Sequence, residues 1–137
     1  MQNTIGKRVM KSSMLKVFLT GCDNNTEWQL PWFVHNYRKH NTIPLVLADF
    51  GMSKEARAIA EESFDLIITV KSEAQGWFKK PRAILDATKL DGVKKVCWLD
   101  TDCEVTEDIS LIFNLSEYGK LGMVKDRPWS TRRSELG

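Results

Sequence analysis

The segment VKKVCWLDTD, residues 93–102, joins a short apolar run to two aspartates. A run of about four to eight apolar and β-branched residues that ends at a polar turn is typical of a buried strand. Asp100 and Asp102 are one residue apart, and on an extended chain such side chains point to the same side. Two neighbouring carboxylates repel each other unless a cation lies between them or one takes up a proton. The segment therefore predicts a strand that ends in a cation-binding or proton-sharing pair.

The rest of the chain repeats this apolar pattern and alternates it with segments of helical periodicity. Strands are expected at residues 15–21, 43–51, 64–70 and 93–100, and residues 120–126 are a candidate for a fifth strand. Helices are expected at residues 30–40, 54–63 and 80–90, with Ser53 as the N-cap of the second one. Alternating strands and helices predict an α/β fold: a Rossmann-like, mostly parallel sheet with helices on both faces.

The composition is that of an ordinary globular domain. The chain has 137 residues, of which 42% are hydrophobic and 28% charged, and this length can bury a core without metal or disulfide staples. A formal net charge of +2 lacks the basic excess of a nucleic-acid binder, and no apolar run is long enough to span a bilayer. We expect a cytoplasmic protein with a loosely ordered basic N-terminus (1–14), one α/β domain (15–126) and a C-terminal tail (127–137).

The cysteines and histidines give no pattern of a metal or disulfide site. Cys22, Cys97 and Cys103 are an odd number without CxxC spacing, so we expect free thiols, with Cys97 as a small core residue. His35 and His40 lie five residues apart in a predicted helix, off the spacing of four that places two ligands on one face. We expect both histidines at the surface.

Acidic residues lie at or just after the ends of three of the predicted strands, at Asp23, Asp49 and Asp100. Because the carboxyl ends of parallel strands meet at one edge of a sheet, where ligands bind, these residues are candidates for a site. Carboxylates are hard oxygen ligands that suit Mg²⁺ or Mn²⁺, whose remaining positions are filled by water and phosphate oxygens. The alternative is an aspartate that caps the following segment, which explains one aspartate at the fourth strand more easily than two.

The segment KKVCWLDTDCEVTEDISLIF, residues 94–113, resembles the DxD region of GT-A-type glycosyltransferases, which have the nucleotide-diphospho-sugar transferase fold. Upstream, KVFLTGCDNN resembles the first strand and nucleotide-entry loop of that fold. PLVLADFGMS resembles its second strand and turn, and WFKKPRAILDA the helix before the DxD strand. The resemblance extends from Leu15 to Asp126, and its most specific part is the DxD motif in its strand context.

The resemblance implies a metal-dependent transferase that moves a sugar from a UDP- or GDP-sugar to a saccharide or other hydroxyl acceptor. Asp102 would be the principal ligand of Mn²⁺ or Mg²⁺, and Asp100 would contact the ribose or reach the metal through water. Gly21, Cys22 and Asp23 would line the base pocket, Asp49 would bind base or ribose, and Lys80 would face the nucleotide or remain a solvated lysine at a helix start.

The chain departs from the family because few residues follow Asp102 and none of them is His. We therefore expect the nucleotide-binding half of the fold without the acceptor-binding half, so that donor, acceptor and stereochemistry stay open. One alternative is a non-catalytic nucleotide-binding module, completed by self-association or by a partner chain. Another is a phosphohydrolase of the haloacid-dehalogenase type with Asp100 as nucleophile, although Glu104 stands where that family usually has Thr or Val.

Overall fold

The computed structural model describes residues 14–117 and 119–123, apart from the side chain of Trp77. The expected N-terminal segment, except for its last residue, and the C-terminal tail lie outside these ranges. Residues 120–123 of the candidate fifth strand have no strand structure, and residues 124–126 lie outside the described ranges. No helix within the described ranges combines the length and the apolar character needed to cross a bilayer.

The strands form one parallel sheet in the order β3-β2-β1-β4. Neighbouring strands are in register, so that Phe18 of β1 lies opposite Leu45 of β2 and opposite Cys97 of β4. All three strand pairings are parallel, which confirms the predicted Rossmann-like α/β fold. The strands are β1 (Lys16–Cys22), β2 (Leu45–Asp49), β3 (Leu66–Thr69) and β4 (Lys95–Trp98).

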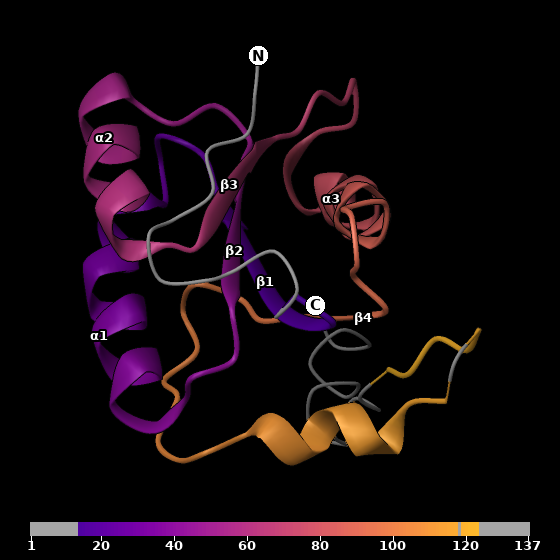
Figure 1. Ribbon diagram of the computed structural model, residues 1–137. Helices are drawn as coiled ribbons and strands as arrows, with labels where there is room; N and C mark the ends of the chain where they lie inside the picture. Colours follow the sequence, from indigo (N-terminus) through magenta and orange to yellow (C-terminus); the bar gives the residue numbers. More distant parts are fainter. Residues whose placement is uncertain (1–13, 118, 124–137) are drawn as a thin grey trace, which may run out of the picture.

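The helices cover both faces of the sheet, as predicted. Figure 1 shows α1 and α2 against one face and α3 against the other. The Ser53 hydroxyl accepts a hydrogen bond from the Ala56 N–H at 3.2 Å, so the expected N-cap of α2 is confirmed. The helices are α1 (Leu30–His40), α2 (Lys54–Ser63) and α3 (Lys80–Thr88), with 3₁₀ turns η2 (Glu27–Gln29), η3 (Gly76–Lys79) and η4 (Ser110–Leu115).

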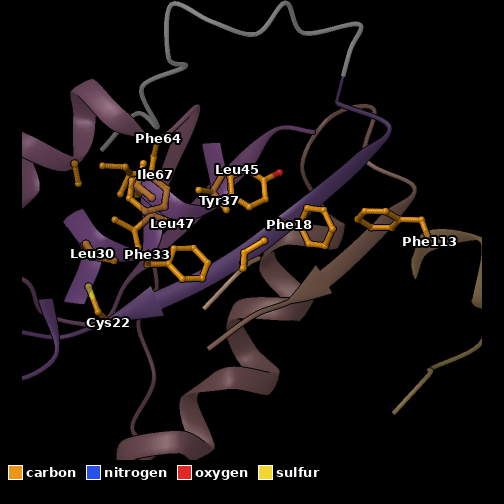
Figure 2. Packing of buried hydrophobic residues seen from close by; sticks show 13 residues of the cluster. Phe18, Cys22, Leu30, Phe33, Tyr37, Leu45, Leu47, Phe64, Ile67 and Phe113 are labelled. Carbon is orange, nitrogen blue, oxygen red and sulfur yellow. The ribbon is translucent and has the colours of Figure 1, made fainter. Parts of the chain in front are cut away.

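The alternation of side chains along each strand divides the apolar residues between two cores. On the face of α1 and α2, Phe18 packs edge-on against Tyr37, with ring centroids 5.7 Å apart (Figure 2). On the opposite face, Leu19 belongs to the cluster that contains Ala83 and Ala87 of α3. Full burial of a large apolar side chain stabilises the fold by about 1.5–3 kcal/mol, so these two clusters hold the helices on the sheet.

The chain reverses direction across the sheet between β1 and β4. From β1 it moves outward through β2 to β3, and it then crosses the other face by way of α3 to form β4 on the far side of β1. The crevice outside the carboxyl ends of strands at such a switch point is where ligands bind in open α/β sheets. The loop after β1, residues 23–29, and the turn after β4, residues 99–103, flank this switch point.

The segment after β4 is attached to the core by contacts that sequence patterns do not show. The side-chain amide of Asn41 donates to the Glu107 carbonyl at 3.0 Å, and its oxygen accepts from the Ile109 N–H at 2.9 Å. Phe113 belongs to η4, an element that periodicity did not predict, and its ring is tilted against that of Phe18 with the centroids 4.8 Å apart. These contacts hold the C-terminal part of residues 99–113, and the Leu99 N–H, which donates to the Leu19 carbonyl at 2.8 Å, holds the other end.

Candidate functional site

Asp100 lies just beyond the end of β4 and binds two donors through a single oxygen. Its Oδ1 accepts a hydrogen bond from Lys80 Nζ at 2.5 Å and from Trp98 Nε1 at 2.8 Å. Lys80 Nζ also lies 5.6 Å from the centroid of the Trp98 ring. Burial raises the pKa of Asp100, but the hydrogen bonds from Lys80 and Trp98 outweigh burial and hold the pKa below its ordinary value. Asp100 is therefore a carboxylate at neutral pH.

Asp102 lies on a turn and not on an extended strand. The Cys103 N–H donates to the Asp100 carbonyl at 3.1 Å, so the side-chain alternation of a strand does not apply to residues 100–103. Thr101 is buried, and its hydroxyl donates to Gln29 Oε1 at 2.5 Å. Asp102 is exposed, and no hydrogen bond or ion pair joins it to another residue in the described part of the chain. The turn thus directs Thr101 inward and leaves Asp102 accessible from solvent.

The loop after β1 is shaped by Asp23. Its Oδ1 accepts hydrogen bonds from the Asn25 N–H at 2.8 Å and from the Thr26 N–H at 3.2 Å, which makes it the centre of a tight turn. The same loop is joined to the turn after β4 by the hydrogen bond between Gln29 and Thr101. Asp23 and Asp100 therefore lie on the two segments that flank the switch point, as their positions after strands predicted.

Gly21 and Cys22 have structural roles at the end of β1. A Cβ on Gly21 would lie 2.5 Å from the ring of Phe50 and 2.9 Å from the ring of Trp98, so only glycine leaves room for these aromatic side chains. Cys22 is 2% exposed and belongs to the core on the α1 and α2 face (Figure 2). Burial, followed by the negative charges nearby, raises its pKa to about 12. The thiol of Cys22 thus faces the core and not a surface that a base could reach.

The remaining cysteines and the histidines agree with the expectations from sequence. All three cysteines are free thiols, and Cys97 packs against the core while Cys103 is exposed. His35 and His40 are both exposed on α1. Cys103 is part of the acidic turn, where its backbone N–H donates to the Asp100 carbonyl.

Asp49, at the end of β2, is buried and uses both carboxylate oxygens within the protein. Its Oδ1 accepts from the N–H groups of Gly51 and Met52 at 2.8 and 2.7 Å, and its Oδ2 accepts from Arg57 Nη1 at 2.7 Å. Burial raises the pKa of Asp49, but these hydrogen bonds and the charge of Arg57 lower it more, so the group is ionised. A base or ribose that bound Asp49 would have to replace one of these bonds.

The residues at the end of β4 suit a divalent cation that binds together with a phosphate group. Asp100 already attracts a cation, since the ammonium of Lys80 lies on its Oδ1. Within residues 14–117 and 119–123, no three side chains of His, Cys, Asp or Glu come together as a metal cage. One or two carboxylates with water and phosphate oxygens are the ligand set that Mg²⁺ prefers. The chemistry of Asp100 and Asp102 thus matches the two-carboxylate part of such a ligand set.

The described part of the chain has a hollow of about 510 Å³ elsewhere, between the outer faces of α1 and α2. It is open to solvent and shares no residue with the switch point. The hollow is lined by Val34, His35, Arg38, Lys39, Ile59, Glu62 and Ser63.

Sequence reasoning missed two contributors to the candidate site. Gln29 is the partner of Thr101 across the switch point, and nothing in the local pattern distinguishes it from any other polar residue before a helix. Trp98 packs against the core on the face of α3, and its indole N–H in addition donates to Asp100 Oδ1. A tryptophan at the last position of a strand does carry a signal, because a partly buried indole N–H needs an acceptor nearby.

Comparisons with known proteins do not assign the chain to a family. Protein-family models give no match to this chain, and the curated proteins include no match to it either. The function therefore has to be inferred from the geometry at the switch point together with the DxD motif.

Proposed function

We propose that this chain is the nucleotide-sugar-binding part of a metal-dependent glycosyltransferase, with a UDP- or GDP-sugar as donor and a hydroxyl group as acceptor. The observation that carries the proposal is the position of Asp100 and Asp102. They follow the strand that adjoins β1 across the switch point, where the loop of Asp23 faces them. Lys80 reaches the Asp100 carboxylate from α3, which lies on the opposite side of the sheet from α1 (Figure 1).

The proposed chemistry requires positive charge near the leaving group. When a sugar leaves its nucleotide, negative charge grows on the departing diphosphate, and Mg²⁺ or Mn²⁺ bound at this place would neutralise that charge as a Lewis acid. Asp100 and Asp102 would hold the cation, and Lys80 would supply a second positive charge in the same region. Trp98 fixes the orientation of the Asp100 carboxylate through its N–H group.

The loop of residues 23–29 is the proposed position of the nucleoside. It flanks the switch point opposite the acidic turn, and the hydrogen bond between Gln29 and Thr101 fixes the spacing of the two segments. The Asn24 N–H also donates to the Gly51 carbonyl at 3.0 Å, so this loop is attached to the turn after β2 as well. A ligand surface held at both sides loses little entropy on binding, which favours affinity.

A second candidate function is a nucleotide-binding module without transferase activity that is completed by another chain. Large apolar side chains are exposed along the segment after β4, and exposed apolar surface marks interaction sites. Gel filtration together with a sugar-transfer assay distinguishes the two candidates, because a monomer that transfers sugar contradicts the non-catalytic module. The exposed side chains, with exposed fractions of 73–86%, are Leu111, Leu115, Leu121 and Met123.

The proposed function is tested by calorimetry with UDP- and GDP-sugars, each with and without Mn²⁺. We expect binding that depends on Mn²⁺ and that is lost in Asp102→Asn. A matched control is Glu62→Gln, which removes the same charge from α2, away from the switch point. Bound ligand also stabilises the fold by about 2.7 kcal/mol at a hundredfold excess over Kd, so the thermal midpoint rises. Absence of Mn²⁺-dependent binding with every donor would contradict the proposal.

A further inference from the structure

Lys80 and Asp100 form an ion pair at the place where the proposed function puts a metal. The ammonium lies 2.5 Å from Asp100 Oδ1, the oxygen that also accepts from Trp98. We propose that Lys80 is an exchangeable internal cation: it neutralises Asp100 in the metal-free chain and releases it when a divalent cation and a nucleoside diphosphate bind, whereupon the ammonium pairs with the diphosphate. This inference rests on the proposed function and assigns Lys80 two successive partners.

The exposure of the pair allows such an exchange. The side chains of Lys80 and Asp100 are 34% and 47% exposed, so water and ions reach both groups. An ion pair of this exposure is weak, so Lys80 can leave Asp100 at little cost. A divalent cation and the Lys80 ammonium would also repel each other if both lay on the Asp100 carboxylate. A divalent cation therefore competes with Lys80 for Asp100, while Asp102, which is exposed, adds a carboxylate that favours the divalent cation.

The surroundings of the pair keep Asp100 in place during the exchange. Trp98 donates to the carboxylate independently of Lys80, so its hydrogen bond persists when the ammonium leaves. Lys80 is the first residue of α3, a helix of nine residues whose N-terminal N–H groups favour an anion nearby. The flexible stem of a lysine lets its ammonium move between partners, which a rigid guanidinium does less readily.

Lys80→Met tests the exchange because it should change two affinities in opposite directions: the affinity for Mn²⁺ alone and the affinity for a nucleoside diphosphate in the presence of Mn²⁺. Calorimetry with Mn²⁺ alone should show tighter binding to this variant than to the unsubstituted chain by about two- to fivefold, the equivalent of a partly exposed ion pair. Calorimetry with UDP or GDP in the presence of saturating Mn²⁺ should show weaker binding, again by at least about twofold. A residue that only supports the fold would not change the two affinities in opposite directions.

Two further variants separate the ion pair from general charge and from folding. Lys79→Met removes the same charge one position earlier, from a residue that forms no ion pair with Asp100. It should change the affinities for Mn²⁺ and for the nucleoside diphosphate less than Lys80→Met does. Lys80→Arg keeps a cation at the position and should restore the weaker affinity for Mn²⁺ alone. Circular dichroism confirms that each variant is folded.

The outcomes distinguish this inference from the proposed function. If the unsubstituted chain binds Mn²⁺ with nucleotide but Lys80→Met and Lys79→Met behave alike, the exchange is refuted and the proposed function stands. If the unsubstituted chain binds neither Mn²⁺ nor any Mn²⁺–nucleotide combination, the proposed function fails and the exchange fails with it. Opposite changes in the two affinities, found in Lys80→Met alone, support the exchange.

Discussion

Two pairs of a basic residue and an aspartate lie at opposite edges of the sheet and differ in burial. At the amino edge, Asp65 Oδ2 accepts from Arg38 Nη2 at 2.9 Å and from the Leu45 N–H at 2.7 Å. The Asp65 side chain is 0% exposed. At the carboxyl edge, the side chains of Lys80 and Asp100 are 34% and 47% exposed. The Arg38 side chain is 20% exposed, so the first pair is mostly closed to solvent, whereas both members of the second pair are open to it.

The comparison teaches that two pairs of the same charges can differ in what they contribute to stability, because they differ in burial. Arg38 and Asp65 join α1, β2 and the start of β3, and Asp65 Oδ1 and Arg38 Nε have no hydrogen-bond partner within the described residues. Removal of Arg38 would leave Asp65 as an uncompensated buried charge, and removal of Asp65 would take the carboxylate from Arg38 and the acceptor from the buried Leu45 N–H. Lys80 and Asp100 have water as an alternative partner, so the fold tolerates their separation. The predictions below test this difference.

The largest effect is expected at the buried pair. Asp65→Ala leaves Arg38 without its partner and the Leu45 N–H without its acceptor, so the free energy of unfolding should fall by about 3–5 kcal/mol. Urea unfolding measures this change. Glu61→Ala, which removes an exposed partner of Arg57 at 3.7 Å, is the control, with an expected loss of about 0.3–0.5 kcal/mol. Equal losses in both variants would remove the basis of the comparison.

The next effect concerns Asp49, a carboxylate that is buried although it lies at the carboxyl edge. Asp49→Asn weakens the hydrogen bonds from Gly51, Met52 and Arg57, so stability at neutral pH should fall by about 1.5–3 kcal/mol. The variant extends the comparison to a buried carboxylate at the carboxyl edge. A loss of this size would show that burial affects the contribution of an aspartate to stability more than the edge of the sheet at which it lies. Chemical unfolding at pH 7 provides the value.

The same residue predicts a pH dependence. The pKa of Asp49 in the folded chain lies below its unfolded value of about 3.9. Its stabilisation is therefore present above that unfolded value and is lost as the pH falls through the folded pKa. Unfolding measured from neutral pH down to strongly acidic pH should depend less steeply on pH in Asp49→Asn than in the unsubstituted chain. Identical slopes would show that other carboxylates govern acid unfolding.

A smaller effect is expected from crowding next to the open pair. Gly21→Ala places a methyl group 2.5 Å from Phe50 and 2.9 Å from Trp98, which should cost about 1–3 kcal/mol. Displacement of Trp98 should also change its fluorescence, because its N–H binds Asp100. Gly122→Ala, where no atom lies within 4 Å of an added Cβ, is the matched control and should leave stability unchanged.

The smallest effect on stability is expected at the open pair itself. Lys80→Met should change the free energy of unfolding by less than about 1 kcal/mol at neutral pH, because both side chains remain in contact with solvent. Urea unfolding of this variant next to Asp65→Ala compares the two pairs directly. A loss as large as that of Asp65→Ala would mean that Lys80 and Asp100 are structural.

The local patterns of the sequence predicted the elements of the fold well. The limits of α2 are those expected, because Ser53 and the apolar positions after it act over a few residues. β2 and β4 are shorter than expected, since Pro44 precedes the paired residues of one and the turn at Asp100 follows the other. Apolar periodicity marks where a strand is buried better than where its pairing ends.

The places of the strand-end residues in the fold could be predicted from the sequence, but their contacts could not. The strand-end rule placed Asp23 and Asp100 on neighbouring segments, yet the hydrogen bonds of Gln29 with Thr101 and of Asn41 with Ile109 join residues far apart in the sequence. No local pattern contains such pairs. The burial of Cys22 did have a signal, since it continues the alternation that buries Phe18 on the same face.

The order of the strands has a consequence for how the molecule folds. β4 is the last strand in the chain and pairs with β1, the first, so that Leu19 meets Trp98 only after α1, β2, α2, β3 and α3 have been traversed. Closing so long a loop is entropically costly, and pairing of this kind is slow. A chain in which only β1, β2 and β3 are paired would therefore lack the acidic turn, which takes its place only when β4 joins β1.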